Sequence, residues 1–192
     1  MGKIKTFVAV QVSRSIRQSA SRCIDRLESS GAGYNWVETD NLHVTLNFAG
    51  DMDEMEIPDF CKSIKRAVSS HSPFSMTVEG VGAFPNLELP RTIWLGVTEG
   101  TEALNELHLE IAEVVRDFGV NKEKNAYVPH LTLGRLRRSG RWNQVMSDAM
   151  VRMAKHEAGS CFVEKVAVFS SHMDRMGPTY SVMASAPLEG DQ

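Results

Sequence analysis

The chain has 192 residues, 42% of them hydrophobic and 23% charged, a composition typical of one folded domain or of two small lobes that share a core. Its net charge of −3 argues against a protein that coats nucleic acid with a broad basic face, although it allows a local basic patch. No apolar run is long enough to span a bilayer and the first residues do not resemble a signal peptide, so we expect a cytoplasmic protein with no membrane partner.

The first half of the chain is predicted to alternate strands with helices. Ser15 and Gln18 have the spacing of a capping box, and the helix that they open carries apolar residues at helical spacing until Gly31. Strands are expected at residues 5–12, 42–48 and 74–81, with a second helix at residues 57–70.

The second half repeats this order. A Pro-containing loop around residues 84–86 leads to further strands, which are expected at residues 92–97, 130–136, 162–170 and 179–186. Between them the pattern predicts a helix from Thr101 to Gly119 and a Met-rich helix at residues 142–155.

A His-x-Thr sequence occurs once in each half, at a matching place. The two histidines, His43 and His130, are 87 residues apart, which is close to half the chain. Each half therefore runs strand, helix, His-x-Thr strand, helix, strand, as an old duplication would. We expect an α+β fold with two pseudo-symmetric lobes, each an antiparallel sheet flanked by helices. The lobes would intertwine into a single domain over residues 1–192, with a cleft between them.

The two motifs are His43-Val44-Thr45-Leu46 and His130-Leu131-Thr132-Leu133. Side chains alternate across a strand, so the His and the Thr of each motif share one face and the two apolar residues anchor the other face in a core. The other four histidines have no Thr at this offset. This arrangement puts four polar groups into the cleft on rigid elements.

Two histidines and two hydroxyls suit phosphodiester hydrolysis. A reference pKa of about 6.5 lets one imidazole act as a base on water while a protonated one acts as an acid on the leaving oxygen. The hydroxyls of Thr45 and Thr132 can donate hydrogen bonds to the non-bridging oxygens, where transition-state charge collects. No carboxylate is placed to complete a nucleophilic triad.

A metal centre is the less favoured interpretation. Threonine hydroxyls are poor ligands for zinc, and Asp51 and Asp53 are expected in a loop with other acids. The cysteines, Cys23, Cys61 and Cys161, form no C-x-x-C pair and are expected as small buried side chains. We therefore predict no metal and no cofactor.

At this point the sequence resembles the 2H phosphoesterase superfamily, specifically the RNA 2′,3′-cyclic phosphodiesterase family, also called the 2′-5′ RNA ligase family. The resemblance covers almost the whole chain. It includes both His-x-Thr strands with their flanks (41–50 and 129–135), the opening strand (6–10), Gly82-Ala83-Phe84-Pro85, residues 91–97, and Gly177-Pro178-Thr179-Tyr180.

The resemblance implies hydrolysis of a terminal RNA 2′,3′-cyclic phosphate to a 2′-phosphate, and reversible 2′-5′ joining of RNA without ATP. It makes His43 the proton donor and His130 the proton acceptor, with the phosphate held by Thr45 and Thr132 and close to Arg135. The partner would be an RNA end with a cyclic phosphate, or a small nucleotide, and the protein is expected to be a monomer.

Four residues are expected to bind substrate beside the catalytic set: Arg135 near the phosphate, and Phe48, Tyr127 and Tyr180, with Trp36 as a further candidate, to stack on the terminal base. For each aromatic residue taken alone, core packing is the favoured interpretation. Strict alternation turns Arg135 away from the histidines unless a bulge at Gly134 re-aims it; otherwise it is a solvated arginine at the strand end.

Residues 135–141 contain four arginines directly after the second motif. This segment is either a site that steers an RNA backbone or a plain solvated turn. Two other functions stay open. One is a related phosphodiesterase for small cyclic nucleotides, and the other is a nucleotide-binding module without turnover.

Overall fold

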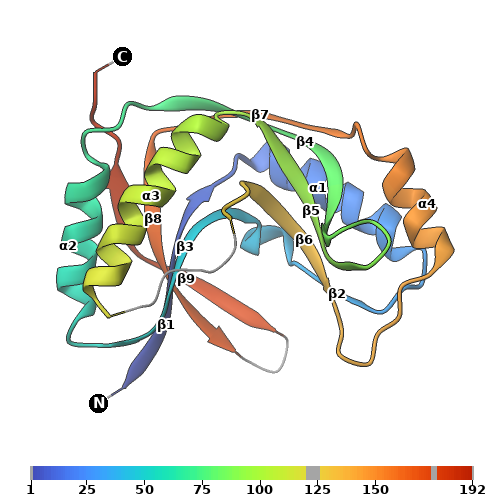
Figure 1. The fold of residues 1–192 in the computed structure, drawn as a ribbon, viewed down its shortest axis with the longest axis horizontal. Coiled ribbons are helices and arrows are strands. Elements are labelled where there is room, and N and C mark those ends of the chain that lie inside the picture. The colour runs from blue at the N-terminus through green and yellow to red at the C-terminus, as the bar shows by residue number, and fades with distance from the viewer. Residues whose placement is uncertain (1, 120–125, 174–176, 192) are drawn as a thin grey trace.

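The computed structural model describes residues 2–119, 126–173 and 177–191. Over these ranges the chain forms one curled antiparallel sheet of nine strands, covered by four α-helices. Figure 1 shows α2 (Ile57–Val68) and α3 (Thr101–Asp117) at one end of the sheet, and α1 (Arg14–Glu28) and α4 (Gln144–Arg152) at the other. The expected α+β class and the two-lobed arrangement are confirmed.

The strand order is β7-β4-β5-β6-β3-β1-β8-β9, and a short β2 pairs with β6. Strands β3, β1, β8 and β9 form one lobe with α2 and α3, while β7, β4, β5, β6 and β2 form the other lobe with α1 and α4. The strands span Lys3–Gln11 (β1), Tyr34–Trp36 (β2), His43–Asp53 (β3), Phe74–Pro85 (β4), Pro90–Glu99 (β5), His130–Leu136 (β6), Glu157–Val163 (β7), Lys165–Met173 (β8) and Pro178–Pro187 (β9).

The two lobes join where β3 meets β6. Among the described residues, the register of this pair has one match, Val44 opposite Leu131. These two residues are also 87 positions apart, so equivalent points of the two motif strands meet at the junction. Strand β4, the last of the first half, pairs with β5 of the second half, so each half of the chain contributes to the other lobe. The duplication itself stays a prediction.

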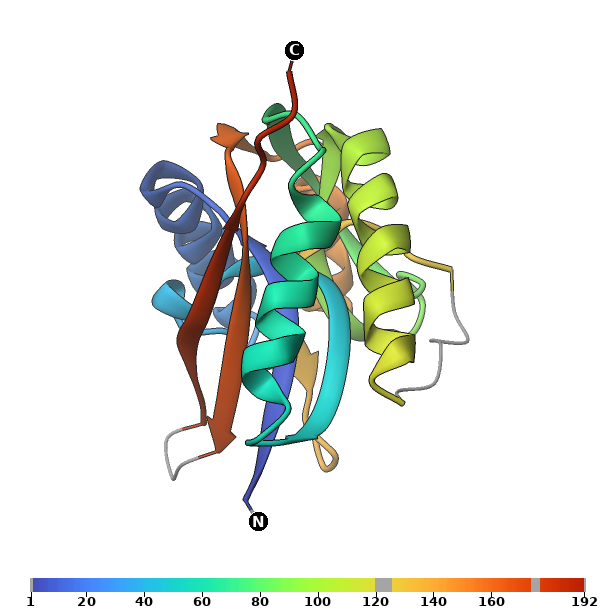
Figure 2. The same ribbon diagram turned by 90° about the vertical axis from the view of Figure 1, so that its left-hand side faces the viewer.

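The helices cover the sheet through the apolar faces that their sequences predict. The described core of α1 contains Ile16, Ala20, Cys23, Ile24 and Leu27, none more than 7% exposed. In the other lobe, α3 packs on α2 and on β3, and Figure 2 shows these two helices side by side against the sheet. Burying each large aliphatic side chain contributes about 1.5–3 kcal/mol, so these faces fix the helices and with them the strands that carry the motifs.

Helix α1 begins earlier than predicted. Its N-cap is Ser13, whose Oγ accepts a hydrogen bond from the backbone N–H of Ile16. The predicted capping box at Ser15 is wrong, because Ser15 already lies within the helix and only Ser13 has the extended backbone that an N-cap needs. The third helix begins at Thr101 as expected, with Gly100 as its N-cap, and it ends just before Gly119.

Several strands are longer than the sequence pattern indicates. Strand β3 runs to Asp53, so Asp51 and Asp53 lie in a strand and not in the expected loop. Strand β4 includes the residues around Phe84 that were expected to form the connection to β5. The strand expected at residues 162–170 is two strands, β7 and β8, and α4 ends at Arg152. The cause is pairing across the sheet: the distal part of β3, for example, pairs with β1, so a segment with the polar composition of a loop continues as a strand.

Candidate active site

The two histidines begin the two central strands, His43 on β3 and His130 on β6. Val44 and Leu131, which pair at the junction, are fully buried on one face of the sheet. The residues that flank this pair on each strand are the His and the Thr of each motif, and all four are half-buried on the opposite face. The register therefore brings the two motifs together around the junction.

A cavity of about 390 Å³ opens on this face. His43, Thr45 and Thr132 line it together with Arg135 and Lys5. No Asp or Glu is among its described lining residues, so its two formal charges are both positive. Such a cavity suits an anion, and the side chains that reach it suit a phosphate group.

Both imidazoles are held through the same ring nitrogen. Nδ1 of His43 lies 2.6 Å from the backbone O of Asn41, and Nδ1 of His130 lies 2.7 Å from the backbone O of Val128. A carbonyl oxygen only accepts, so each Nδ1 carries the hydrogen and each neutral ring has its lone pair on Nε2. Nε2 is thus the reactive nitrogen of both rings. In His43 it lies 3.0 Å from Oγ1 of Thr45.

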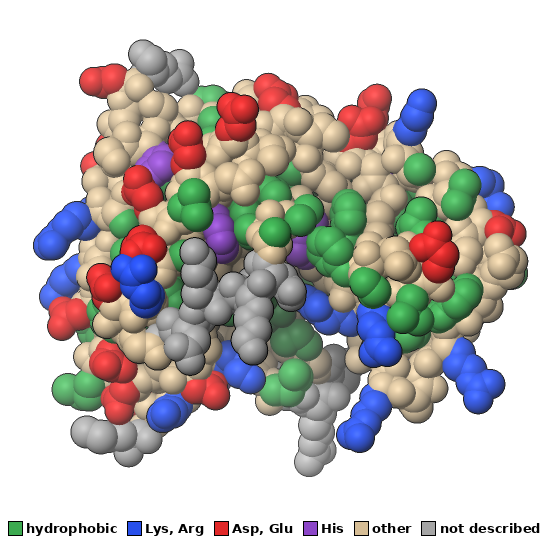
Figure 3. Space-filling view, viewed as in Figure 1, with side chains coloured by type: hydrophobic (Ala, Val, Ile, Leu, Met, Phe, Trp, Pro, Cys, Tyr) green, Lys and Arg blue, Asp and Glu red, His purple; other side chains and the backbone are tan. Residues whose placement is uncertain are grey.

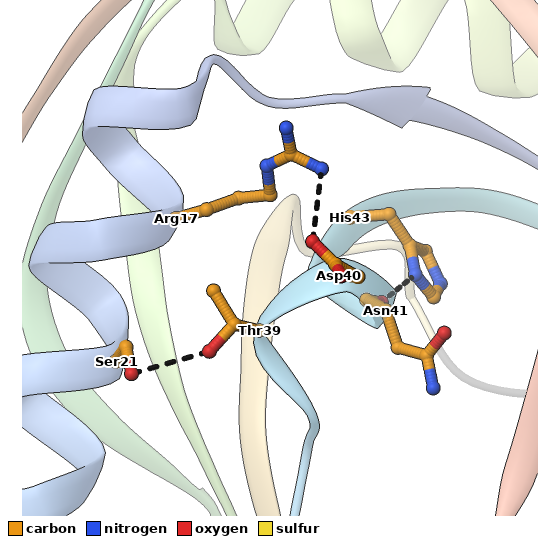
Figure 4. A network of polar contacts seen from close by, with 6 residues as sticks. All are labelled: Arg17, Ser21, Thr39, Asp40, Asn41 and His43. Carbon is orange, nitrogen blue, oxygen red and sulfur yellow. Dashed lines mark hydrogen bonds and ion pairs between the residues drawn. The ribbon is translucent and has the colours of Figure 1, made fainter.

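The carbonyl that holds His43 belongs to a short 3₁₀ helix, η1 (Thr39–Asn41), which Figure 4 shows against α1. Thr39 donates a hydrogen bond to Oγ of Ser21 at 3.2 Å, and an exposed ion pair joins Arg17 to Asp40 at 3.8 Å. The side-chain amide of Asn41 donates to the backbone O of Pro178 at 2.8 Å. An exposed pair contributes little stability, so the packing of η1 and the Asn41 bond position this carbonyl.

Aromatic rings enclose His43 on its own lobe. The ring centroids of Phe7 and Phe169 lie 4.9 and 6.1 Å from that of the imidazole, and the Tyr180 ring is nearly perpendicular to it at a centroid distance of 5.4 Å. These rings come from β1, β8 and β9, the three strands beyond β3. They remove water from the imidazole and fix its plane.

His130 has a matching enclosure in the other lobe. The Phe84 ring is nearly perpendicular to the imidazole at a centroid distance of 5.0 Å, and the Trp94 ring centroid lies at 6.1 Å. Trp94 is 87 residues after Phe7, so the pseudo-symmetry extends to one of the enclosing rings on each side. His130 itself is not among the described residues that line the cavity of about 390 Å³, although its charge acts on His43.

Burial lowers the pKa of both histidines below the ordinary value of 6.5. For His43, desolvation is the largest cause, and the bond to Asn41 O opposes it, while positive charge on His130 and on Arg135 lowers the pKa further. For His130, desolvation again comes first, opposed by the bond to Val128 O and assisted by Arg135. Both imidazoles of the free protein are therefore predominantly neutral at neutral pH.

A β-bulge turns Arg135 into the cavity. Along the β5–β6 pair, Trp94 is opposite Thr132 and Ile93 is opposite Gly134, which leaves Leu133 as an extra residue on β6. Side-chain alternation breaks there, and Arg135 is exposed and lines the cavity beside Thr132. Its Nη1 donates to Oγ1 of Thr92 at 3.3 Å. The bulge anticipated at Gly134 is therefore present.

The same bulge occurs on β3. Ala9 is opposite Thr45 and Val8 is opposite Asn47, which leaves Leu46 as the extra residue. Leu46 and Leu133 are 87 residues apart, so Phe48 and Arg135, each two residues after the extra residue of a bulge, occupy equivalent positions on the two strands. Phe48 is 50% exposed and lines the cavity, so one strand contributes an aromatic ring and the other a guanidinium.

Tyr180 lines the cavity, and Tyr127 is not among its described lining residues. The Tyr127 ring stacks on His108 at 4.1 Å, and its hydroxyl donates to the backbone O of Thr45 at 3.1 Å. Nδ1 of His108 in turn lies 2.9 Å from the backbone O of Leu46. Tyr127 thus supports the backbone of the first motif, and its predicted stacking on a base stays a prediction.

Lys5 was not predicted as a site residue. It lies on β1 opposite Asp51 on β3 and Ser171 on β8, and it supplies the second positive charge of the cavity. Its sequence context, a lysine near the start of an apolar strand, carries no signal of this role. Only the pairing of β1 between β3 and β8 reveals it.

Within residues 2–119, 126–173 and 177–191, no three His, Cys, Asp or Glu side chains gather where they could hold a metal ion. Independence from metals stays a prediction. No helix of the described ranges is long and apolar enough to cross a membrane.

Comparison with known proteins gives matches over almost the whole chain. A family model described as the 2′-5′ RNA ligase superfamily matches residues 15–175. The RNA 2′,3′-cyclic phosphodiesterase of Thermotoga maritima is 32% identical over 188 residues, which cover 97% of both chains. The protein of the same description from Aquifex aeolicus is 31% identical over 191 residues, 99% of this chain and 100% of the relative.

Solved structures share the fold. A Thermus thermophilus protein superposes with a TM-score of 0.82 at 24% identity, covering 98% of this chain and 100% of its own. Escherichia coli LigT complexed with 3′-AMP superposes with a TM-score of 0.78 at 20% identity, covering 97% of this chain and 98% of its own. The two-lobed architecture therefore extends over the full length of both neighbours.

Proposed function

Since the chain belongs to the 2′-5′ RNA ligase superfamily, we propose that it hydrolyses RNA 2′,3′-cyclic phosphate ends to 2′-phosphates, with His43 and His130 as acid and base. One observation carries the proposal. Both imidazoles donate through Nδ1 to a backbone carbonyl two residues upstream, so both direct a reactive Nε2 to one face of the central strands. Relatives described as RNA 2′,3′-cyclic phosphodiesterases support the substrate.

The same anchoring serves either proton transfer. When neutral, a ring with hydrogen on Nδ1 accepts a proton at Nε2, and when protonated it donates one from Nε2. In the proposed reaction, His130 takes a proton from water as the water oxygen attacks phosphorus. The bond from phosphorus to the ribose 3′ oxygen breaks, and His43 gives its proton to that oxygen. The 2′ oxygen keeps the phosphate.

Other residues that line the cavity bind the phosphoryl group and the terminal base. Thr45 and Thr132 flank the junction of β3 and β6, and their hydroxyls donate to the non-bridging oxygens. Arg135, with Lys5 on the opposite lobe, balances the negative charge of the diester. Phe48 and Tyr180 line the same cavity and offer ring faces to the terminal base.

Ligation would use the same site with a different nucleophile. If the 5′-hydroxyl of a second RNA replaces water, the attack on the cyclic phosphate breaks the same bond and leaves a 2′-5′ linkage. No ATP is needed, because the strained cyclic diester is already activated. The description of the matching family supports this second outcome.

The proposal is tested with purified protein, a short RNA with a 2′,3′-cyclic end, and 2′,3′-cyclic mononucleotides. Phosphorus NMR of the product should show a 2′-phosphomonoester and no 3′-phosphomonoester. Turnover of small cyclic nucleotides alone would favour the small-nucleotide alternative. Binding without turnover of either substrate would favour a non-catalytic nucleotide-binding module. Either result would contradict the proposal.

A further inference from the structure

A second cavity, about 510 Å³ in volume, lies beyond the end of β6. Four arginines line it, Arg91, Arg137, Arg138 and Arg141, and we call it the arginine pocket. No acidic side chain is among its described lining residues, and no ion pair joins any of the four to an Asp or Glu of the described chain. On a protein of net charge −3, such a concentration of unpaired positive charge indicates an anionic ligand.

The pocket is built on a turn that the fold holds in place. The N–H of Arg137 donates to the backbone O of Gly33, the N–H of Gly33 donates to the backbone O of Arg141, and the N–H of Gly140 closes the turn on Arg137 O, at 2.9–3.0 Å. Gly33 and Gly140 touch so closely that a Cβ on Gly140 would meet the Gly33 carbonyl. These contacts hold the backbone that carries the arginines, so binding there would require less ordering of the chain than binding to a free surface loop.

The pocket also contains apolar surface. Trp142 is 37% exposed and Leu89 is 42% exposed, and both line it beside the arginines. Guanidinium groups interleaved with an exposed aromatic ring form the combination that binds single-stranded nucleic acid, with charges on the backbone and a ring face for a base.

Strands β5 and β6 connect the active site to the arginine pocket. Arg135 of β6 lines the catalytic cavity, and Arg137, two residues later, directly follows the end of the strand, so their Cα atoms are at most about 7 Å apart. On β5, Thr92 pairs with Arg135 and directly follows Arg91. In Figure 3, several Lys and Arg side chains gather at the lower right, where Figure 1 shows the end of β6 and its connection to α4.

The 5′-to-3′ polarity of the RNA determines which part of the substrate can reach the arginine pocket. A 2′,3′-cyclic phosphate ends a chain at its 3′ side, so every other phosphate of the molecule lies on the 5′ side of the reacting nucleotide. We propose that the arginine pocket binds the phosphodiesters immediately upstream of the cyclic end, and so makes the enzyme prefer an RNA chain over a mononucleotide. This inference rests on the proposed function and specifies its substrate class.

Kinetics on two substrates test it. The variant Arg137→Gln/Arg138→Gln/Arg141→Gln should turn over a 2′,3′-cyclic mononucleotide at the wild-type rate, because that substrate has no upstream phosphate. On a six-nucleotide RNA with the same cyclic end, KM should rise roughly tenfold or more at low salt, and the logarithmic salt dependence should weaken by about 0.7 for each lost phosphate contact. Arg91→Gln and Trp142→Ala should give smaller losses on the RNA alone.

The control is Arg152→Gln/Lys155→Gln, which removes two exposed positive charges from the same lobe outside the described pocket lining and should leave turnover of both substrates unaffected. An equal effect of the triple variant on both substrates, no effect on either, or the same RNA loss in the control would overturn the inference. If the wild type turns over neither substrate, the proposed function fails. In that case, fluorescence anisotropy with a labelled RNA bearing a 2′-phosphate still decides whether the triple variant loses binding, as the inference requires, or keeps it.

Discussion

Replacing Gly134 by alanine tests whether the β6 bulge and the ring that covers it hold Arg135 in the cavity. A Cβ at this position would lie 2.5 Å from Cε3 and 2.8 Å from Cζ3 of Trp36, where ordinary contacts are 3.4–4 Å. The indole must then retreat by about 1 Å, although it stacks on the buried Tyr34 at 5.3 Å. Overpacking of this kind typically lowers the free energy of unfolding by about 1–3 kcal/mol.

Urea unfolding of four proteins measures the effect: wild type, Gly134→Ala, Trp36→Ala and the double variant. Without the indole, the tight contact that remains for the added methyl group is the backbone O of Asn35 at 3.2 Å, so the cost of Gly134→Ala should fall to less than half in the Trp36→Ala background. Gly134→Ala should also lower kcat/KM, because moving the bulge displaces Arg135. An equal cost in both backgrounds, or no cost in either, would refute the role assigned to the indole.

Three further predictions follow from the site. The profile of kcat/KM against pH should be bell-shaped with its maximum below pH 6.5, because burial lowers the pKa of both histidines of the free enzyme. Arg135→Gln should move both limbs to higher pH, because the positive charge of Arg135 lowers both pKa values. A rate still climbing above pH 9 would exclude a histidine acid. The free energy of unfolding should fall as pH drops below 6.5, because the histidines of the unfolded chain then bind more protons than those of the folded protein. Urea titrations at pH 5 and pH 7 should show that His43→Asn reduces this dependence. An unchanged dependence on pH would contradict the burial argument. Turnover should survive exhaustive chelation, whereas activity abolished by a chelator and restored by one divalent ion would exclude the two-histidine mechanism.

The motif residues illustrate what alternation along a strand can predict. From His43-Val44-Thr45-Leu46 and its partner, the two-residue period is enough to predict which side chains share a face, and the structure places them so. The spacing of 87 residues indicates the lobe symmetry that the sheet displays at Val44 and Leu131. These features depend on local periodicity, which the sequence contains.

Other features depend on pairing between distant segments. Alternation alone turns Arg135 away from the cavity, and only its register against β5 establishes the bulge that turns it back. Lys5 and Arg91 join their sites because strands remote in sequence lie side by side. Tyr127 bonds to Thr45 O and stacks on His108, a contact between segments that no local pattern specifies, while its stacking on a base stays a prediction.

The assignment of acid and base is tested most directly by changing the leaving group. If His43 protonates the departing ribose oxygen, His43→Ala should lose a factor of roughly 10² to 10⁴ in kcat/KM on the cyclic ribose diester. It should lose much less on an aryl phosphodiester, because a phenolate leaves without a proton. His130→Ala lacks the base that activates water, so it should be severely impaired on both substrates. If the aryl substrate instead restores His130→Ala and leaves His43→Ala inactive, the two roles are reversed and the proposed mechanism is wrong.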